Sequence, residues 1–460
     1  MIQRSVAPAA RLILNLFLDQ FMCKSGITAI LVLLLTAAFG LTLACDNVGP
    51  ATAAKASSVP VVTLAPDASE GAIRFLEDRV KKDPDDFIAY NKLQGYYLLR
   101  LRETGNVTWL DLATRAAQAS LKAMPLEQNP GGLAGLVQAE FDAHEFAAAR
   151  DHSQQLIQLE GNKGYPYQLL TDALLELGDY DGAEKAWREL QKRDRNSVAA
   201  LTRQARLATL RGQPEIAERL YTEATLGAAK LVPASRETVA WCRWQLGEHH
   251  FNQGDYEAAE KHYRDALITY PDYYRALAGL GKTLAARGDL AGGMVQYERV
   301  VNILPEPAFV AALGDLYKLT GREKEANAQY AMVEQSGKLS QAKGNLYNRQ
   351  LALFYADHDV KVEEAYLLAK KEYDARRDIY GADALAWTAF KANHLEEAQT
   401  AMKEALHLGT RDARLWYHAA LIARATGDQS AAVKHLKQTL QLNPQFDPLQ
   451  AAIARKALAQ

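Results

Sequence analysis

Apolar residues recur every three to four positions along the chain from about residue 70 onward. This spacing places them on one face of an α-helix, and it continues with few interruptions. The breaks contain residues that end helices or turn the chain, such as Gly254-Asp255, Pro271 and Pro305. The pattern therefore predicts an all-α fold made of many helices.

The breaks and the small residues repeat with a fixed period. Gly281 follows Gly247 after 34 positions, and the same interval separates further Tyr, Pro and Ala residues. A small residue lets two helices cross closely, an aromatic ring fills the space beside it, and Pro ends the second helix. Such a period indicates an array of repeated helix pairs. The residues for which we expect these structural roles are Gly247, Ala259, Tyr263, Pro271, Gly281, Tyr297, Pro305, Gly314, Ala398 and Ala432.

Residues 244–271 carry a more specific resemblance, in the sequence WQLGEHHFNQGDYEAAEKHYRDALITYP. Leu246-Gly247 in the first helix and Gly254-Asp255-Tyr256 at the turn resemble the tetratricopeptide repeat, a helix-turn-helix unit of 34 residues. The resemblance covers 87–445 and implies a right-handed α-solenoid of about ten repeats. A leading helix at 70–86 and a closing helix at 446–460 are expected to cap its ends.

An uncharged apolar run, Ile27–Ala44, follows Lys24 near the N-terminus. Such a run is typical of a signal peptide or a short membrane anchor. It leads into LTLAC, ending at Cys45, which resembles the lipobox of bacterial lipoproteins, although Thr occupies a position where Leu is usual. The resemblance implies cleavage before Cys45 and a lipid attached to that residue. An uncleaved anchor and plain secretion remain the alternatives.

The N-terminal charges also predict an orientation. Basic residues precede the apolar run, which places the chain after residue 45 outside the cytoplasm, on the periplasmic side of a bacterial envelope. Residues 1–44 are expected to act as the signal or anchor; Met22 begins a more typical signal, so 1–21 is an alternative, over-extended start. Residues 45–69 are rich in Ala, Ser, Thr and Pro and are predicted to form a flexible tether.

The net charge and the cysteine content argue against several classes of partner and site. The formal net charge is −2, so no basic excess is available to neutralise the phosphates of a nucleic acid. The three cysteines are Cys23, Cys45 and Cys242. If Cys23 leaves with the signal and Cys45 is acylated, Cys242 alone can form neither an intramolecular disulfide nor a cysteine-based metal site. We expect Cys242 to be a packing residue.

One stretch superficially matches a phosphate-binding loop, at Ala276-x4-Gly281-Lys282-Thr283. A genuine loop of this kind follows a strand and presents backbone amides from a glycine-rich bend, whereas this stretch has helical spacing. We therefore expect no nucleotide there. Adjacent histidines, His249 and His250, point about 100° apart on a helix and cannot share a metal as an i, i+4 pair can. No cofactor, no metal and no enzymatic activity is predicted.

A stacked-helix solenoid offers a concave inner surface lined by the first helix of each pair. In the tetratricopeptide-repeat family, ligand contacts come from the second, fifth, ninth, twelfth and thirteenth positions of each repeat. Either these residues form a binding groove for an acidic or carboxylate-bearing segment, or they are a solvated inner face with one Trp packed between repeats. The groove candidates are Gln168, Asp172, Thr202, Arg206, Trp241, Trp244, Glu248, Asn252, Arg275, Lys282, Asp315, Lys318 and Arg349.

These features together predict a non-enzymatic scaffold. It would be tethered to the bacterial envelope through Cys45 and would gather envelope proteins or peptides in its concave groove. The family resemblance suggests outer-membrane or pilus assembly, or polysaccharide synthesis and export, without choosing among them. An alternative from another class is a targeting subunit of an enzyme whose catalytic chain is separate. That alternative predicts one stoichiometric partner, whereas a scaffold predicts several.

Overall fold

The computed structural model describes residues 69–231, 234–342 and 349–460. Within these ranges the chain forms 22 α-helices and one short 3-10 helix, and it contains no β-strand. None of the described helices combines the length and the apolar character needed to cross a bilayer. The predicted signal or anchor, the lipid site Cys45 and the tether up to residue 68 lie outside the described residues.

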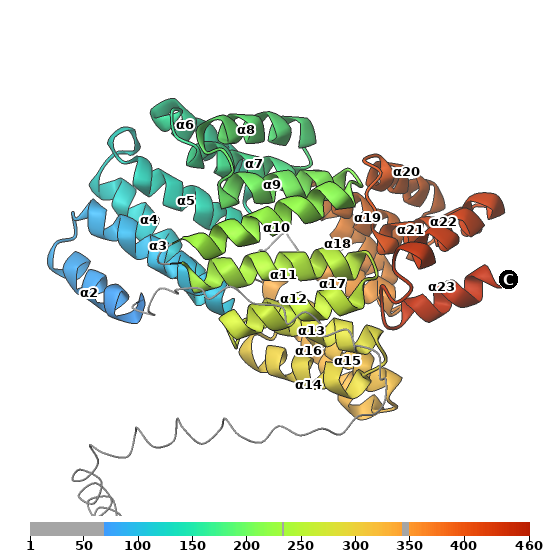
Figure 1. Ribbon diagram of the computed structural model, residues 1–460. Helices are drawn as coiled ribbons and strands as arrows, with labels where there is room; N and C mark the ends of the chain where they lie inside the picture. The colour runs from blue at the N-terminus through green and yellow to red at the C-terminus, as the bar shows by residue number, and fades with distance from the viewer. Residues whose placement is uncertain (1–68, 232–233, 343–348) are drawn as a thin grey trace, which may run out of the picture. The chain divides into compact units, whose positions relative to one another are not determined.

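Twenty of the helices, α3 to α22, form ten successive pairs that stack into a solenoid (Figure 1). The first helices of the pairs are α3 (Phe87–Thr104), α5 (Pro130–Asp142), α7 (Tyr165–Leu177), α9 (Val198–Leu210), α11 (Arg236–Asn252), α13 (Tyr274–Ala286), α15 (Pro307–Leu319), α17 (Arg349–Asp357), α19 (Ile379–Lys391) and α21 (Ala413–Ala425). The second helices are α4 (Thr108–Ala123), α6 (Phe146–Glu160), α8 (Tyr180–Arg193), α10 (Pro214–Lys230), α12 (Tyr256–Thr269), α14 (Leu290–Ile303), α16 (Glu323–Ala342), α18 (Val362–Ala375), α20 (Leu395–Leu406) and α22 (Gln429–Leu442). Helices α2 (Ser69–Lys82) and α23 (Gln450–Leu458) flank the array, and the 3-10 helix spans Leu126–Gln128.

The turn inside a pair follows from two adjacent residues. At the α11–α12 turn, Gly254 adopts a φ of +76°, a left-handed conformation that glycine reaches at little cost. The side chain of the next residue, Asp255, accepts a hydrogen bond from the Ala258 amide at 3.1 Å and so caps α12. The same cap begins α8, α14 and α22, at Asp179, Asp289 and Asp428.

Small residues let each pair pack around an aromatic ring. Tyr263 of α12 is fully buried, and its ring fits against Gly247 of α11 and Gly279 of α13. A Cβ at either glycine would overlap this ring, so the close helix crossing requires glycine. Tyr297 occupies the matching place beside Gly281 one repeat later.

The first helices of successive pairs touch one another and form the inner surface of the solenoid. Such contacts join α3 to α5, α5 to α7, α7 to α9, α11 to α13, α15 to α17, α17 to α19 and α19 to α21. The superhelix then closes on itself, because residues about 200 positions apart, six pairs later in the chain, lie in contact. The Tyr180 hydroxyl accepts a hydrogen bond from the Ile379 amide at 2.8 Å, and Thr410 donates to the Leu210 carbonyl.

A charge cluster whose carboxylates are mostly buried joins the two superhelical turns. Glu176 of α7 pairs with Arg206 of the neighbouring α9 and with Arg376, which lies 200 residues farther along the chain. Arg376 also contacts Asp378 at 3.2 Å, and Arg349 contacts Asp378 at 2.7 Å. Burial opposes the charged form of Glu176, but the guanidinium groups of Arg206 and Arg376 lower its pKa to about 2. These ion pairs fill this part of the inner surface.

Candidate binding cavity

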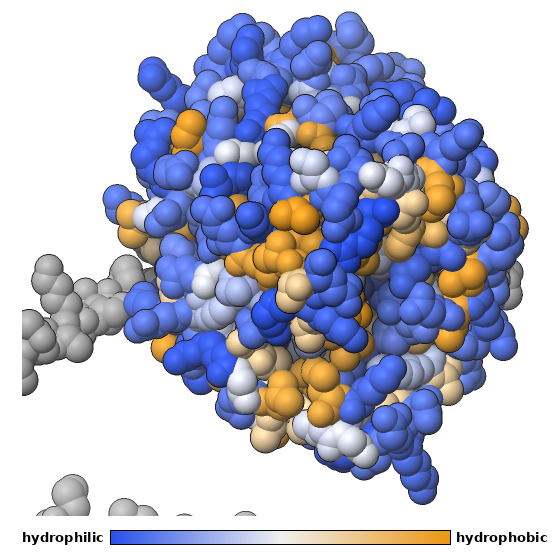
Figure 2. Space-filling model, turned by 90° about the vertical axis from the view of Figure 1, so that its right-hand side faces the viewer, coloured by the Kyte–Doolittle hydropathy of each residue, from blue (hydrophilic) through white to orange (hydrophobic). Residues whose placement is uncertain are grey.

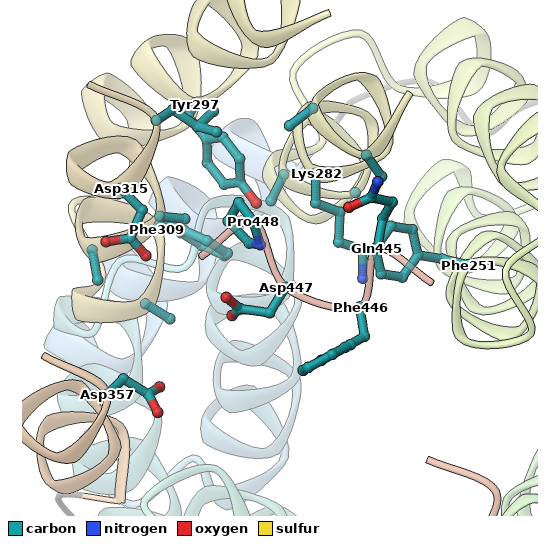
Figure 3. A pocket seen from close by; sticks show the side chains of 18 of the residues that line it. Phe251, Lys282, Tyr297, Phe309, Asp315, Asp357, Gln445, Phe446, Asp447 and Pro448 are labelled. Atoms are coloured by element: carbon teal, nitrogen blue, oxygen red, sulfur yellow. The ribbon is translucent and has the colours of Figure 1, made fainter. Parts of the chain in front are cut away.

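The inner surface opens into a cavity of about 770 Å³ between the two superhelical turns (Figure 3). One side is built by the first helices of four consecutive pairs, α11, α13, α15 and α17. The other side is built by Arg414 of α21 and by Gln445–Pro448, from the connection between α22 and α23. The cavity therefore depends on superhelical closure, because no single repeat encloses it.

Much of the lining is apolar. Phe309 of α15 and Phe354 of α17 contribute rings, and alanines on α13 and α15 leave room between the helices. Trp244 and Phe251 of α11 line the opposite end. An apolar cavity of this size with a few polar groups is typical of ligand-binding sites.

Three of the four Lys and Arg residues in the lining are paired with carboxylates. Lys282 contacts Glu248 at 2.7 Å and its Nζ lies 4.3 Å from the centre of the Phe251 ring. Arg414 contacts Asp447 at 3.2 Å. The third pair, at the rim, joins Arg287 to Glu260. Their charges are therefore already neutralised within the protein.

Arg275 differs from these three. Its guanidinium lies 5.3 Å from the centre of the Trp244 ring and 5.0 Å from that of Tyr274. No carboxylate within the described residues forms an ion pair with it at 4.0 Å or less. A guanidinium is permanently charged and has five N–H donors, so this group is suited to binding an incoming anion.

Two carboxylates that line the cavity, those of Asp315 and Asp357, accept hydrogen bonds from other side chains of the protein. Asp315 accepts hydrogen bonds from the Tyr330 hydroxyl at 2.8 Å and from Nε2 of His358 at 2.8 Å. Burial disfavours the imidazolium, but the bond to Asp315 outweighs it and raises the pKa of His358. Asp357 accepts from Trp387 at 2.8 Å and from Gln450 at 2.5 Å, and burial raises its pKa.

Five of the thirteen groove candidates line this cavity: Trp244, Glu248, Arg275, Lys282 and Asp315. Two others, Arg206 and Arg349, belong to the charge cluster, and Asp172 pairs with Arg203 nearby. Thr202 is buried and bonds to the Val198 carbonyl of its own helix. Trp241 packs against the core between α11 and α12. Gln168 is half-buried, whereas Asn252 and Lys318 are exposed.

Several lining residues were not singled out by the repeat pattern. Phe309, Phe354 and Asp357 lie on first helices, where the pattern alone does not separate cavity from core. Arg414 and Gln445–Pro448 come from the tenth pair and the connection after it, two to five pairs later than the helices of the other side, and only superhelical closure brings them to the cavity. The sequence signal near them is the Pro444 and Pro448 pair, which marks a non-helical connection without showing where it lies.

The other motifs noted in the sequence lie within helices. The stretch Ala276–Thr283 lies inside helix α13, where Lys282 binds Glu248. Cys242 is 1% exposed, and burial raises the pKa of its thiol to about 12. In the described part of the chain, no group of three or more His, Cys, Asp or Glu side chains is arranged to hold a metal ion. His249 is buried and His250 is half-buried.

Comparisons with known proteins agree with the repeat architecture. The tetratricopeptide repeat family matches residues 169–234, 245–304 and 384–445. Tetratricopeptide repeat protein 21A of Mus musculus is 25% identical over 172 residues, which is 33% of this chain, and the match spans 13% of that much longer relative.

Two solved structures are among those to which the chain is similar. PilW, a type IV pilus biogenesis factor, is 14% identical, and the match covers 49% of this chain and 97% of PilW with a TM-score of 0.38. Human IFIT1, solved as a dimer with PPP-AAAA, is 11% identical, and the match covers 83% of this chain and 96% of IFIT1 with a TM-score of 0.45. The described chain is an α-solenoid, and the residues that the family model matches, 169–234, 245–304 and 384–445, are tetratricopeptide repeats.

Proposed function

We propose that this protein is an envelope-anchored scaffold that binds a short, carboxylate-bearing segment of a partner protein in the cavity. The observation that carries the proposal is Arg275, the one Lys or Arg of the lining for which the described structure shows no ion pair within 4.0 Å, although Glu306 and Glu237 lie near enough to interact with its charge. A carboxylate bound there gains a charge-assisted hydrogen bond in partly desolvated surroundings. Apolar side chains of the same segment would bury themselves against Phe309 and Phe354.

The shape of the inner surface supports a short segment over a long one. Cavities of roughly 300–1,000 Å³ accommodate ligands of drug size, and this one measures about 770 Å³. Elsewhere the inner helices are joined across the superhelical turns by the ion pairs around Glu176. A peptide running along every repeat would have to break those pairs.

Membrane anchoring remains part of the proposal. Its support is the apolar run Ile27–Ala44 followed by Cys45, together with the tether rich in Ala, Ser, Thr and Pro. Confinement to a surface raises the effective concentration of a weakly bound partner, which suits a single short-segment site. Replacing Cys45 with Ser is expected to abolish incorporation of radiolabelled palmitate.

The decisive experiment compares two arginine reversals in the full-length, tagged protein purified from detergent-solubilised membranes. Arg275→Glu places a negative charge at the proposed anchor, and we expect recovery of co-purifying partners to fall tenfold or more, since charge-assisted bonds contribute about 1.5–3 kcal/mol. Arg219→Glu, at an exposed position on the second helix α10, is the matched control and should leave recovery unchanged. Circular dichroism would establish that both variants fold.

Each outcome has a defined meaning. Loss with Arg275→Glu alone supports the cavity as the binding site. Equal recovery with both variants would place binding outside the cavity and overturn the proposal. A single stoichiometric partner would favour the targeting-subunit alternative, and the absence of any partner after cross-linking would contradict the scaffold function itself.

A further inference from the structure

One nearly buried hydroxyl of the cavity has no hydrogen-bond partner among the described residues. Tyr297 of α14 is 7% exposed and lines the cavity, and its ring packs beside Gly281 of α13 within a core cluster. None of the described side chains or backbone groups bonds to its hydroxyl. Figure 3 shows this hydroxyl pointing toward Pro448 and the interior of the cavity. Because buried polar groups are usually paired, the hydroxyl points to a ligand that supplies the bond.

The repeat pattern explains why this bond is missing. Tyr263, the equivalent tyrosine of the preceding pair, donates to Glu248, 15 positions before it, at 2.7 Å. Tyr330 of the following pair donates in the same way to the carboxylate 15 positions before it, at 2.8 Å. In the same position before Tyr297 the chain has Lys282, whose ammonium binds Glu248. An ammonium cannot accept the hydroxyl proton, so the Tyr297 hydroxyl remains directed at the cavity.

Carboxylates border the same part of the cavity. We call Asp315, Asp357 and Asp447, together with Tyr297, the acidic end. Figure 3 shows the three carboxylates around one open space. Burial, together with the negative charges of Glu248, Asp315 and Asp447, raises the pKa of the Tyr297 hydroxyl. The hydroxyl therefore stays neutral and lies at a negative potential, which favours a positively charged ligand.

Two of these carboxylates each have an oxygen that is available to a ligand. Asp357 accepts its hydrogen bonds from Trp387 and Gln450 through Oδ1. Asp315 likewise uses Oδ1 for both of its bonds. Within the described residues, no hydrogen bond reaches Oδ2 of either carboxylate. Both Oδ2 atoms can therefore accept hydrogen bonds from a ligand.

Asp357 also lacks the ion pair that the other two carboxylates have. Asp315 pairs with His358 at 2.8 Å. Asp447 pairs with Arg414 at 3.2 Å. No described Lys, Arg or His forms an ion pair with Asp357 within 4.0 Å. Burial raises the pKa of Asp357 although the charge of Arg414 opposes this, and an incoming cation would favour its charged form.

We propose that the acidic end binds the ammonium group of a lysine side chain. It offers three acceptors, namely Oδ2 of Asp357, Oδ2 of Asp315 and the hydroxyl oxygen of Tyr297. An ammonium has three N–H donors, which this set can receive. The apolar four-carbon stem of the lysine lies against the lining rings Phe309 and Phe446.

The source of the lysine rests on the function proposed above. Arg275 binds the carboxylate of the partner segment, and the acidic end selects segments that also carry a lysine. Figure 2 shows the face that carries α22 and α23, where hydrophilic residues surround a group of apolar side chains near the centre. A segment with both charged and apolar groups matches these surroundings.

Disulfide exchange at one introduced thiol measures the preference of the acidic end without any partner. In the full-length chain carrying Cys23→Ser and Cys45→Ser, Ala311→Cys places this thiol in the lining, about one helical turn before Asp315. Cystamine attaches a short ammonium group to it, and bis(2-hydroxyethyl) disulfide attaches the neutral analogue. Cys242 is buried and should not react.

The measured quantity is the equilibrium ratio of the two adducts at pH 8, determined by intact-mass spectrometry. Dividing it by the ratio for the same chain unfolded in guanidinium chloride removes the intrinsic difference between the two disulfides. We expect the folded chain to favour the ammonium adduct about tenfold, because hydrogen bonds between charged groups are stronger than neutral ones.

Two substitutions in the acidic end should reduce this preference. Asp357→Asn keeps a side-chain oxygen for Trp387 and removes the charge, and we expect a preference of only about twofold. Tyr297→Phe removes one acceptor and should lower the preference about threefold. The matched controls should leave it unchanged: Asp181→Asn makes the same charge change at an exposed position of α8, and Tyr221→Phe alters the equivalent tyrosine of α10, outside the lining.

Three results would overturn the proposal. The first is a chain that shows no preference for the ammonium adduct, and the second is an unchanged preference in Asp357→Asn. The third is an equal reduction by Asp181→Asn, because the net charge of the chain would then account for the preference. If Asp357→Asn lowers the helical content, Tyr297→Phe decides, since its lost hydroxyl bonds to no described residue.

This experiment and the partner-recovery experiment fail independently. Loss of partner recovery in Arg275→Glu, with the adduct preference intact, concerns the carboxylate anchor alone. An absent adduct preference with partner recovery that still depends on Arg275 overturns the lysine site and leaves the proposed function standing.

Discussion

Two arginines with the same predicted role have different surroundings. Arg206 of α9 and Arg275 of α13 are both groove candidates on first helices. Glu176 binds Arg206, whereas Arg275 lies over Trp244 and Tyr274, and no ion pair within 4.0 Å joins it to a described carboxylate. The difference arises because the neighbouring helix α7 places Glu176 within ion-pair distance of Arg206, and Arg376 reaches the same carboxylate from across the turns. A variant such as Arg206→Glu would therefore disturb the fold as well as any groove.

A residue-scale prediction concerns pH. His358 is held by Asp315 and by the Phe354 carbonyl, and the pKa of the folded imidazole is raised. Its contribution to stability is thus fully present below the unfolded pKa of about 6.5 and is lost as pH rises through the folded pKa. We expect His358→Gln to lower the thermal midpoint more at pH 6 than at pH 9.

The thermal midpoint of His358→Gln is compared with that of the wild type at the same pH. Groups that titrate equally in both proteins therefore do not contribute to the difference. Asp357 also lies close to His358 and favours its charged form. A loss of stability that is constant between pH 6 and pH 9, or that grows with pH, would contradict the charged imidazole.

At the scale of elements, the Gly-Asp turns specify where second helices begin. Asp255 caps α12 through the Ala258 amide. Replacing an N-cap Asp with Ala costs about 1 kcal/mol. We expect Asp255→Ala to speed amide hydrogen exchange in the first turn of α12 by about fivefold, measured by mass spectrometry.

Asp272 provides the control for that experiment. Its side chain is 75% exposed in the connection between α12 and α13, with a contact to Arg299 at 3.5 Å. Asp272→Ala should leave exchange in α12 unchanged. Equal effects of the two substitutions would show that the Gly-Asp turn has no special part in starting the helix.

At the scale of the molecule, closure changes how the solenoid should unfold. An open repeat array is held by nearest-neighbour contacts and can unfold in parts. Here Arg376, 13% exposed, joins Glu176 across the turns, and further bonds join α9 to the loop before α21 and α11 to Asn443, which follows α22. These contacts couple repeats that are five or six pairs apart and favour a single cooperative transition.

Arg376→Met tests this coupling. This substitution removes a positive charge that contacts the carboxylates of Glu176 and Asp378. Breaking a buried ion pair in this way typically lowers the free energy of unfolding by roughly 3 kcal/mol. We expect the wild type to show one calorimetric transition and the variant to show a lower midpoint with a broadened or divided transition. A lowered midpoint with unchanged cooperativity would mean that closure does not couple the repeats.

The sequence by itself determined the local architecture of this protein. The 34-residue interval, the Gly-Asp turns and the small residues beside aromatic rings predicted about ten helix pairs, and the fold confirms this all-α solenoid. These features are readable because each acts within one repeat or between neighbours, over distances that the helical period fixes. The positions within the repeat alone also selected five residues that line the cavity.

The tertiary structure decided which inner residues share a cavity. Small rotations between successive pairs accumulate over six repeats, so the place where the turns meet is not encoded at any one position. That accumulated geometry brings Arg376 to Glu176, which already pairs with Arg206 of the neighbouring helix, and it brings Arg414 and Gln445–Pro448 to the cavity that Arg275 lines. The repeat pattern specifies the inner surface, and superhelical closure determines which part of it remains open to a ligand.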